Sequence, residues 1–450
     1  MSASAVTEHF LAAFERLAPL LPGAAAPAVL EARRVALARF ARLGMPTART
    51  EAWRYSTHGN WLRQPLDPAP VVATTAALPG ELTPGNLAAT GLGAHARILF
   101  VDGRRVDEQG TRALPPGLRL HPLSRLLEED TDLARPWLVA AVEAANDGPA
   151  ALNLAFFSEG ALIEVDREAG DVTIELLFVS TAAGVGHTAH THLCMEIADG
   201  AHATVVERHV SLGGVESAAG ADVSRQLHVG SRARLTHAVL QDAHPRLYHL
   251  QRTLAKVGAD AELSLWSLAL GGNLARYEAT VDLIGRGASV DLAGVYSLSG
   301  RQAADHHLTV RHLTPNTRSQ MRFRGLLDGH SRGAFTGCVQ VAPGADGASA
   351  RQANDNLLLS PHAEAVSRPE LGIETDDVQC SHGSTVGQQD ESAVFYLRSR
   401  GIDEAMARSL LSSAFAIEIL RTMPHDGART LALAMLSLHL PQRLALEEML

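Results

Sequence analysis

The sequence has 450 residues, of which 46% are hydrophobic and 20% are charged. This composition is typical of a folded protein with a large buried core, and the length is enough for two or three domains. The formal net charge of −10 argues against a nucleic-acid partner, because DNA- and RNA-binding surfaces need an excess of cationic side chains.

The three cysteines, Cys194, Cys338 and Cys380, lie far apart and form no Cys-x-x-Cys pair. A disulfide framework would need more cysteines, so we expect a reducing compartment. Glu8 and Glu15 interrupt the apolar residues of the N-terminal segment, which is untypical of a signal peptide, and no later apolar run is long enough to cross a membrane. We therefore expect a cytoplasmic protein with no membrane contact.

Residues 1–150 are predicted to form a mostly helical N-terminal region. Apolar residues recur at helical spacing from Val6 to Gly44, and Pro22 and Gly23 divide this stretch into two helices. The remainder is expected to contain a short strand at 97–106 and helical segments near 123–127 and 137–146.

Residues 151–387 consist of short runs of alternating apolar and polar residues, separated by Gly, Asn and Asp, as expected of strands. A fixed period with about two strands per unit and no intervening helix is typical of a β-solenoid. Four glycine-led hexapeptides show such a period, at intervals of 30, 28 and 29 residues: Gly200–Val205, Gly230–Leu235, Gly258–Leu263 and Gly287–Leu292.

The fold class that we predict is mainly β, with a parallel β-helix of roughly eight coils flanked by N-terminal and C-terminal α-helical segments. A β-sandwich is the less favoured alternative, because the Asn-Gly and Asp-Gly hairpins that join adjacent strands of a sandwich are scarce.

Residues 388–450 are expected to form a C-terminal helical docking region. The segment 390–400 is apolar at helical spacing and ends at Gly401, and Asp403 is placed to cap a second helix that runs to Met423. Helices at the end of a solenoid can cover an open sheet edge or present a docking surface.

Two groups of histidines are candidate metal sites: His187 with His190 and His192, and Asp305–His307 with His312. His190 and His192 would share a strand face, but no cysteine or carboxylate lies at ligand spacing beside them. A structural role is favoured for both groups. An amide ladder in the solenoid interior is predicted for three residues that alternate on one strand, Gln352, Asn354 and Asn356.

No motif of a self-contained enzyme is present: the chain lacks GxxxxGK[ST], GxSxG and HExxH. The Cys380–Ser381–His382 triplet is the exception that could carry chemistry, because residues two apart on a strand point to the same side. A thiolate and an imidazole on one face can act as metal ligands or as a nucleophile and its base, while inert packing is the alternative for a buried cysteine.

Several segments of the chain resemble the SufD family: Ala48–Ser56, Arg97–Arg104, Arg322–Ser360, Arg368–Gly387 and Phe395–Ile402. The combination of Cys-Ser-His-Gly at 380–383 with Tyr-Leu-Arg-Ser-Arg-Gly-Ile at 396–402 is the most specific part of the resemblance. It implies a right-handed parallel β-helix with helices at both ends, and a non-catalytic scaffold in the Suf system of iron–sulfur cluster assembly. It also implies pairing with the paralogue SufB through the β-helices and docking of the ATPase SufC on the C-terminal helices.

The resemblance further implies site residues. His382 would meet a SufB cysteine at the interface and share a transient iron–sulfur cluster or iron with SufB, with Cys380 as a second candidate ligand. No tightly bound cofactor is expected on the chain alone, although the assembled complex could hold a flavin. The surface expected to dock the ATPase includes Arg398, Arg400, Asp403 and Phe415.

The sequence is also compatible with two alternatives. β-Helical carbohydrate-active enzymes share the solenoid, but they are usually exported. A self-associating scaffold is the other alternative, because the open edges of a β-helix can also pair with a second copy of the same chain.

Overall fold

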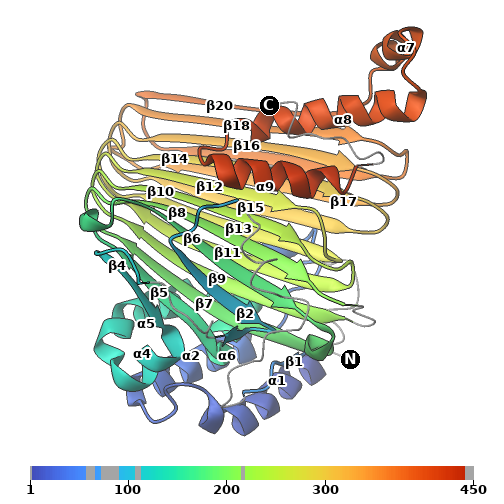
Figure 1. Ribbon diagram of the computed structural model, residues 1–450. Coiled ribbons are helices and arrows are strands. Elements are labelled where there is room, and N and C mark those ends of the chain that lie inside the picture. The colour runs from blue at the N-terminus through green and yellow to red at the C-terminus, as the bar shows by residue number, and fades with distance from the viewer. Residues whose placement is uncertain (1–2, 57–65, 72–90, 107–112, 214–217, 441–450) are drawn as a thin grey trace.

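The computed structural model describes residues 3–56, 66–71, 91–106, 113–213 and 218–440. Its centre is a parallel β-solenoid in which each turn gives one strand to each of two facing sheets, so that strands β5 to β20 form about eight turns (Figure 1). The prediction of a mainly β fold with a parallel β-helix core and flanking helices is confirmed, and the β-sandwich alternative is wrong because sequential strands alternate between the sheets.

Two sheets of ten strands form the solenoid. Sheet A contains β1 (Asp67–Pro68), β4 (Leu118–Pro122), β5 (Glu159–Val165), β7 (His187–Ile197), β9 (Ala219–Val229), β11 (Leu247–Val257), β13 (Leu274–Leu283), β15 (Ala303–His312), β17 (Arg332–Val341) and β19 (Glu364–Ile373). Sheet B contains β2 (Ala96–Val101), β3 (Arg104–Val106), β6 (Asp171–Ser180), β8 (His202–Ser211), β10 (Arg234–Asp242), β12 (Glu262–Ala269), β14 (Ser289–Leu298), β16 (Arg318–Leu327), β18 (Ala348–Leu358) and β20 (Val378–Gln388).

The turn that leads into a sheet B strand repeats from one coil to the next, from β8 to β18. Its left-handed position is taken by glycine in some turns and by other residues in the rest: Gly200, Arg232, Asp260, Gly287, Asn316 and Gly347. The amide of this residue donates to a carbonyl in the following coil, as Arg232 N does to Ala259 O at 2.8 Å. The predicted alignment of the four hexapeptides is wrong by two residues at Gly230 and Gly258. In the structure His202 pairs with Arg234, whereas the predicted alignment pairs His202 with Arg232.

Alternate residues of each strand point between the sheets, and equivalent residues of successive turns stack into columns. One column follows Ile197, Val229, Val257 and Leu283, all of which are fully buried. Together these columns form one hydrophobic core along the whole solenoid.

The first helices cover the outer face of sheet A at its N-terminal coils. They are α1 (Ala3–Leu17), α2 (Pro27–Leu43), α4 (Leu123–Glu129), α5 (Thr131–Ala144) and α6 (Gly148–Phe156), and they share a second hydrophobic core with Leu162 and Cys194 of the sheet. The predicted strand at 97–106 is the hairpin β2–β3, whose first strand pairs in parallel with β6. It is thus part of sheet B.

A short segment after α2 is anchored to the outer face of sheet A by one buried arginine. The Arg276 guanidinium lies 3.9 Å from the ring centroid of Trp53 and donates to Ser56 Oγ at 2.7 Å. Arg276 also pairs with Asp305 at 2.5 Å, which gives that carboxylate a structural role.

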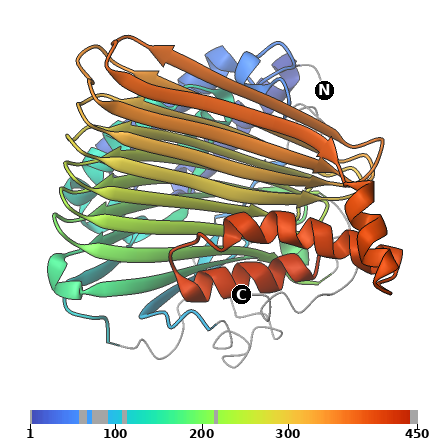
Figure 2. The same ribbon diagram turned by 90° about the horizontal axis from the view of Figure 1, so that it is seen from above.

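The C-terminal helices are α7 (Glu391–Ser399), α8 (Glu404–Leu420) and α9 (Asp426–Ser437). Helices α8 and α9 lie across the outer face of sheet B (Figure 2), where they bury apolar residues such as Trp266 and Leu420. Helix α7 and the beginning of α8 project beyond the solenoid (Figure 1).

The close stacking of the turns leaves no room for a side chain at Gly325 in the interior of β16. A Cβ there would lie 2.3 Å from Tyr296 Cε2 and 2.4 Å from Asn356 Oδ1. We expect Gly325→Ala to lower the free energy of unfolding by about 1–3 kcal/mol, the usual cost of overpacking. Gly387→Ala in β20, where a Cβ meets nothing within 4 Å, is the control and should change it by less than about 0.5 kcal/mol. Equal denaturant midpoints for the two variants would contradict the tight packing described.

Candidate functional site at the open end of the solenoid

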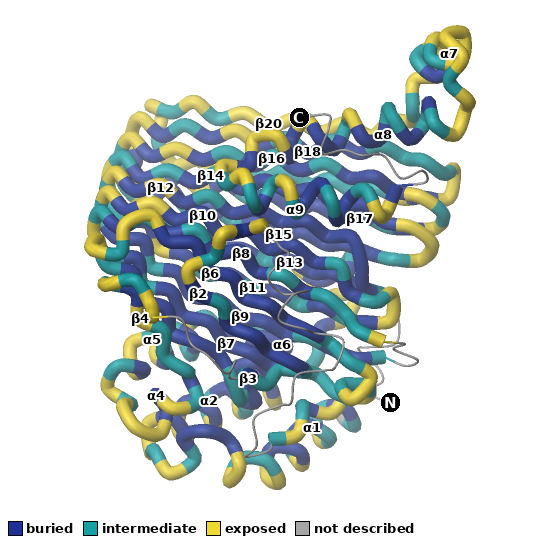
Figure 3. The backbone as a smooth tube through the Cα atoms, in the orientation of Figure 1, coloured by how far each residue is buried: buried dark blue, intermediate teal, exposed yellow. Residues whose placement is uncertain are grey.

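The last described coil of the solenoid has a described strand as neighbour on one side only. Strands β19 and β20 terminate sheets A and B, and no other described strand pairs with their outer edges. At the opposite end, by contrast, the antiparallel strands β4 and β3 close the two sheets. Figure 3 shows the consequence, since the central coils are buried while β20 is exposed over most of its length.

Cys380 and His382 lie on the inner side of this terminal coil. They pair in register with Ala350 and Gln352 of β18, both of which are buried and point between the sheets. Residues in one column point the same way, so Cys380 and His382 face the interior of the solenoid at its open end. The structure therefore brings the two candidate ligands together on one strand face.

The two side chains differ in environment. Cys380 is half-buried against the hydrophobic core, and desolvation raises the pKa of its thiol above the ordinary value. The thiol is thus protonated at neutral pH and is a poor nucleophile alone, although a metal ion would displace its proton. The imidazole of His382 is exposed, and no described residue forms a hydrogen bond with it.

Two ligands are too few for a metal cluster, which needs about four. Within the part of the chain that the structure describes, no group of three or more His, Cys, Asp and Glu residues could hold a metal ion. Cys380 and His382 could therefore supply only part of a coordination shell, and no third ligand lies beside them among the residues that the structure describes.

The amide ladder predicted beneath this site is confirmed. Gln352, Asn354 and Asn356 are all buried on the inner face of β18. Asn356 Nδ2 donates to Asn354 Oδ1 at 2.8 Å, and the Tyr296 hydroxyl donates to Asn356 Oδ1 at 2.5 Å. Gln352, directly below His382, donates to the carbonyl of Glu370 in β19 at 3.0 Å and so bridges the two sheets.

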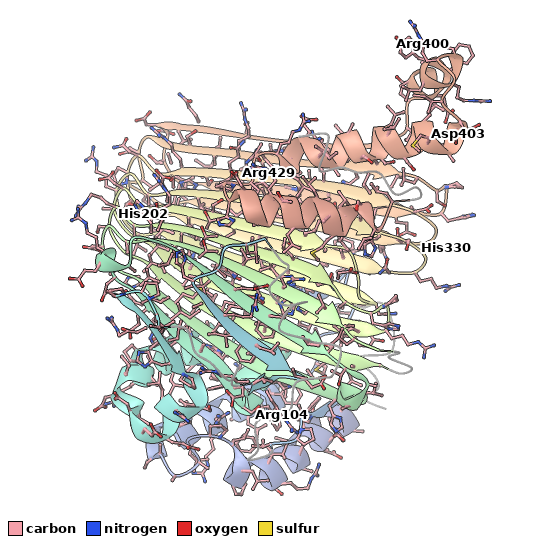
Figure 4. All side chains as sticks on the ribbon, viewed as in Figure 1. Arg104, His202, His330, Arg400, Asp403 and Arg429 are labelled. Carbon is pink, nitrogen blue, oxygen red and sulfur yellow. The ribbon has the colours of Figure 1, made fainter. Side chains whose placement is uncertain are left out.

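Three of the four predicted docking residues lie on the arm formed by α7 and the start of α8. Arg400 lies at the outer part of this arm, and Asp403 lies where α8 begins and caps its Met406 amide at 3.0 Å (Figure 4). Arg398 is exposed and forms an ion pair with Glu404 at 3.3 Å. Phe415 is different, because it is half-buried under the Arg324 guanidinium at 4.7 Å and packs toward sheet B.

The docking residues predicted from the sequence do not include the two most exposed aromatic side chains of the arm. Phe395 is 71% exposed and Tyr396 is 57% exposed, although both belong to α7. The signal that was available is the unbroken run Val394–Leu397, because four consecutive apolar residues cannot all face one side of a helix.

The histidines considered as metal ligands have structural partners instead. His190 Nδ1 lies 2.9 Å from Asp222 Oδ2, His192 contacts Asn153 at 3.4 Å, and His187 contacts the Val185 carbonyl at 3.1 Å. In the second group, His312 bonds Thr317 and Ser319 at 2.8 Å, and His306 is buried among aromatic rings. These contacts agree with a structural role for His187, His190, His192 and His312. Neither ring nitrogen of His306 has a hydrogen-bond partner among the described residues.

None of the helices that the structure describes is long and apolar enough to cross a membrane.

Two family models match the chain. The model described as "SUF system FeS cluster assembly, SufBD core domain" matches residues 178–415, and the one described as "SufBD protein N-terminal region" matches residues 4–173. The residues that the core model matches include most of the solenoid and the beginning of the C-terminal helices.

Individual relatives agree with these models. The iron–sulfur cluster assembly protein SufD of Escherichia coli K12 is 28% identical, with 90% of this chain and 92% of that protein covered. An iron–sulfur cluster assembly SufBD family protein of Mycobacterium tuberculosis is 33% identical over 61% of this chain and 69% of its own length. A SufBD family protein of Synechocystis is 26% identical over 73% of this chain and 74% of its own length.

Proposed function

Because the chain belongs to the SufBD family of iron–sulfur cluster assembly proteins, we propose that it is a non-catalytic, cytoplasmic scaffold subunit of that system. It would pair with a SufB-like paralogue through the terminal coil and dock a SufC-like ATPase on the α7–α8 arm. The observation that supports this best is the open terminal coil, which carries Cys380 and His382 with an incomplete set of metal ligands.

The terminal coil suits a partner with the same architecture. The outer edges of β19 and β20 present backbone N–H and C=O groups that need hydrogen-bond partners once they are covered. A second two-sheet solenoid could continue both sheets at once and satisfy these groups by strand addition. A second copy of this chain could do the same, so self-association is the competing arrangement.

Pairing of this kind would also complete the metal site. Cys380 and His382 face the interior at the end of the solenoid. Ligands on the partner's terminal coil would therefore face Cys380 and His382 across the subunit interface. An iron ion or a nascent iron–sulfur cluster, as the cargo of the assembly, would then take ligands from both subunits. The family match gives no support to a carbohydrate-active enzyme.

The α7–α8 arm is suited to a third subunit. It stands clear of the solenoid and exposes Phe395 and Tyr396 next to Arg398 and Arg400. Exposed aromatic residues beside arginine are the typical composition of an interface hot spot.

The metal-site proposal predicts a selective loss in His382→Ala. We expect the variant to co-purify with a SufB-like partner and a SufC-like ATPase in normal amounts, because the exposed imidazole holds no described contact. After anaerobic reconstitution with iron and sulfide, the complex should lose most of its visible cluster absorbance, because one ligand is missing.

Ser384→Ala is the matched control, since Ser384 is the next inward-facing position of β20 and is also exposed. Equal cluster absorbance in both variants and the wild type would contradict a role for His382 as a ligand. A wild-type chain that forms only a homodimer by light scattering, with the SufB-like partner present, would contradict the heterodimer.

The docking proposal predicts a separate defect in the double variant Phe395→Ser/Tyr396→Ser. Loss of two aromatic anchors should weaken binding of the ATPase by about 30-fold or more, or roughly 2 kcal/mol, without affecting the pairing of the solenoids. Isothermal titration would measure this, with Val139→Ser in α5 as a control that removes an equally prominent exposed apolar residue, 51% exposed. Unchanged affinity of the double variant would place the ATPase elsewhere.

A further inference from the structure

A cavity of about 390 Å³ lies between the two sheets in the first coils of the solenoid, beside the β2–β3 hairpin. On the sheet B side it is lined by Phe100, Phe178 and His209, which are in register in β2, β6 and β8. Adjacent rings of this column lie 4.6 Å apart, with 12° between their planes. Figure 4 shows that the hairpin residue Arg104 lies at the end of the solenoid opposite to the terminal strand β20.

The side chains of sheet A that face these rings are small in the first coils. Thr191 of β7 and Val223 of β9 occupy one inward column and line the cavity. In later coils the same column holds the buried rings of Tyr277, His306 and Phe335. The rings fill the interior there, whereas the smaller side chains of the first coils leave room. The cavity therefore follows from the choice of residues in β7 and β9.

One ring nitrogen of His209 is bound to a buried charged cluster. Its Nε2 lies 2.5 Å from Glu207 Oε1, and Glu207 also accepts from Arg225 Nε at 2.7 Å and contacts His237 Nε2 at 3.3 Å. Burial disfavours the charge on Glu207, but Arg225 and the hydrogen bonds outweigh it and hold the pKa of this carboxyl well below its usual range. Glu207 is therefore ionised, and His209 donates its Nε2 proton to it.

The other ring nitrogen of His209 is left for a ligand. Burial lowers the pKa of His209 in spite of the opposing effect of Glu207, so the imidazole is neutral at neutral pH. A neutral imidazole that donates from Nε2 has an unprotonated Nδ1, which accepts a hydrogen bond. The His209 side chain is 4% exposed and lines the cavity, and no described residue forms a hydrogen bond with its Nδ1. The cavity wall thus offers one acceptor to an O–H or N–H group.

A cationic side chain lies on the rim of the cavity. Arg104 of β3 is half-buried there, and its Nη2 donates to the Pro70 carbonyl at 3.3 Å. Asp102, the acidic residue of the same rim, accepts instead from the Thr181 amide at 2.8 Å and from the Thr181 hydroxyl at 2.5 Å. No described acidic residue forms an ion pair with Arg104, so its remaining N–H groups are available to a carboxylate.

The wall between these two polar groups suits an aromatic ring. Both faces of the Phe178 ring are covered, one by Phe100 and the other by His209, so Phe178 presents its edge to the cavity. The edge of an aromatic ring is partly positive and attracts the negative face of another ring. Val223 and Leu247 on the opposite side add apolar surface.

We propose that this cavity binds a small aromatic carboxylate that carries an O–H or N–H donor on its ring. The ligand ring lies against the edge of Phe178, its donor bonds to His209 Nδ1, and its carboxylate pairs with Arg104. Two steps of 4.6 Å separate the His209 and Phe100 rings, a span that a benzene ring with a short acid side chain can cover. The cavity volume is typical of small-molecule sites, which range from about 300 to 1,000 Å³. The site is independent of the terminal coil and of the proposed function.

Isothermal titration of the full chain with 4-hydroxycinnamate tests the class of ligand. One saturable site is expected. Binding should be weaker by about tenfold or more for cinnamate, which lacks the donor, and for 4-propylphenol, which lacks the carboxylate. Equal affinities for the three compounds, or no binding of 4-hydroxycinnamate at millimolar concentration, would overturn the proposal.

The variant Arg104→Gln tests the place of the ligand. It should weaken the binding of 4-hydroxycinnamate by about tenfold and leave that of 4-propylphenol unchanged, because only the first compound has a carboxylate. Arg301→Gln is the matched control, since it removes an exposed arginine in the turn before β15, and it should bind both compounds as the wild type does. Unchanged affinity of Arg104→Gln for 4-hydroxycinnamate would overturn the site.

A second variant, Val223→Phe, places a ring inside the cavity and should abolish the binding of both compounds. Circular dichroism and the denaturant midpoint show whether this variant is folded. A folded Val223→Phe that binds 4-hydroxycinnamate with wild-type affinity would overturn the proposal. Where Val223→Phe does not fold, Arg104→Gln on the rim decides the outcome.

Discussion

The structure depends on one repeated interaction, the in-register hydrogen bonding of each coil to the next. Every strand from β6 to β18 has a parallel neighbour on both sides, so its backbone groups are satisfied by the coils below and above. The turns take part in the same way, because the residue at each left-handed position donates to the following coil. Such a ladder can always be extended by another coil, and in the part of the chain that the structure describes the outer edges of β19 and β20 are unpaired.

The same register explains why polar chemistry gathers inside an apolar core. Parallel strands in register place equivalent residues on top of one another, so a polar side chain in one turn can be satisfied by polar side chains in the adjacent turns. Glu207, Arg225 and His237 come from three successive strands of the two sheets and meet in this way. The amides of β18 repeat the arrangement beneath His382. The in-register stacking of turns therefore determines both the fold and the position of these polar side chains.

Much of the fold could be predicted from the sequence, because the alternation of apolar and polar residues is local. The strand predicted at 97–106 is the hairpin β2–β3, and Asp403 caps α8 as its sequence position indicates. The exact repeat could not be predicted from glycines alone, since Arg232 and Asp260 take the left-handed position in two turns. Polar side chains such as Asp and Asn adopt this conformation at moderate cost, so the signal is not unique to glycine.

The site was predictable only in part. The shared face of Cys380 and His382 follows from strand geometry, and the structure adds that this face is the open end of the interior. The buried network around Glu207 could not be predicted, because Arg225 and His237 lie 18 and 30 residues further along the chain and only the stacking of turns brings them to it. The exposure of Phe395 and Tyr396 likewise depends on α7 standing away from the solenoid.

The most direct test of the account is amide hydrogen exchange of β19 and β20 in the isolated chain and in the complex with a SufB-like partner. The account predicts that amides on the free edges of these strands exchange rapidly in the isolated chain and become strongly protected in the complex. The central strand β14 should be protected in both. A stable complex in which β19 and β20 gain no protection would show that the partner binds elsewhere, and it would contradict the role assigned to the terminal coil.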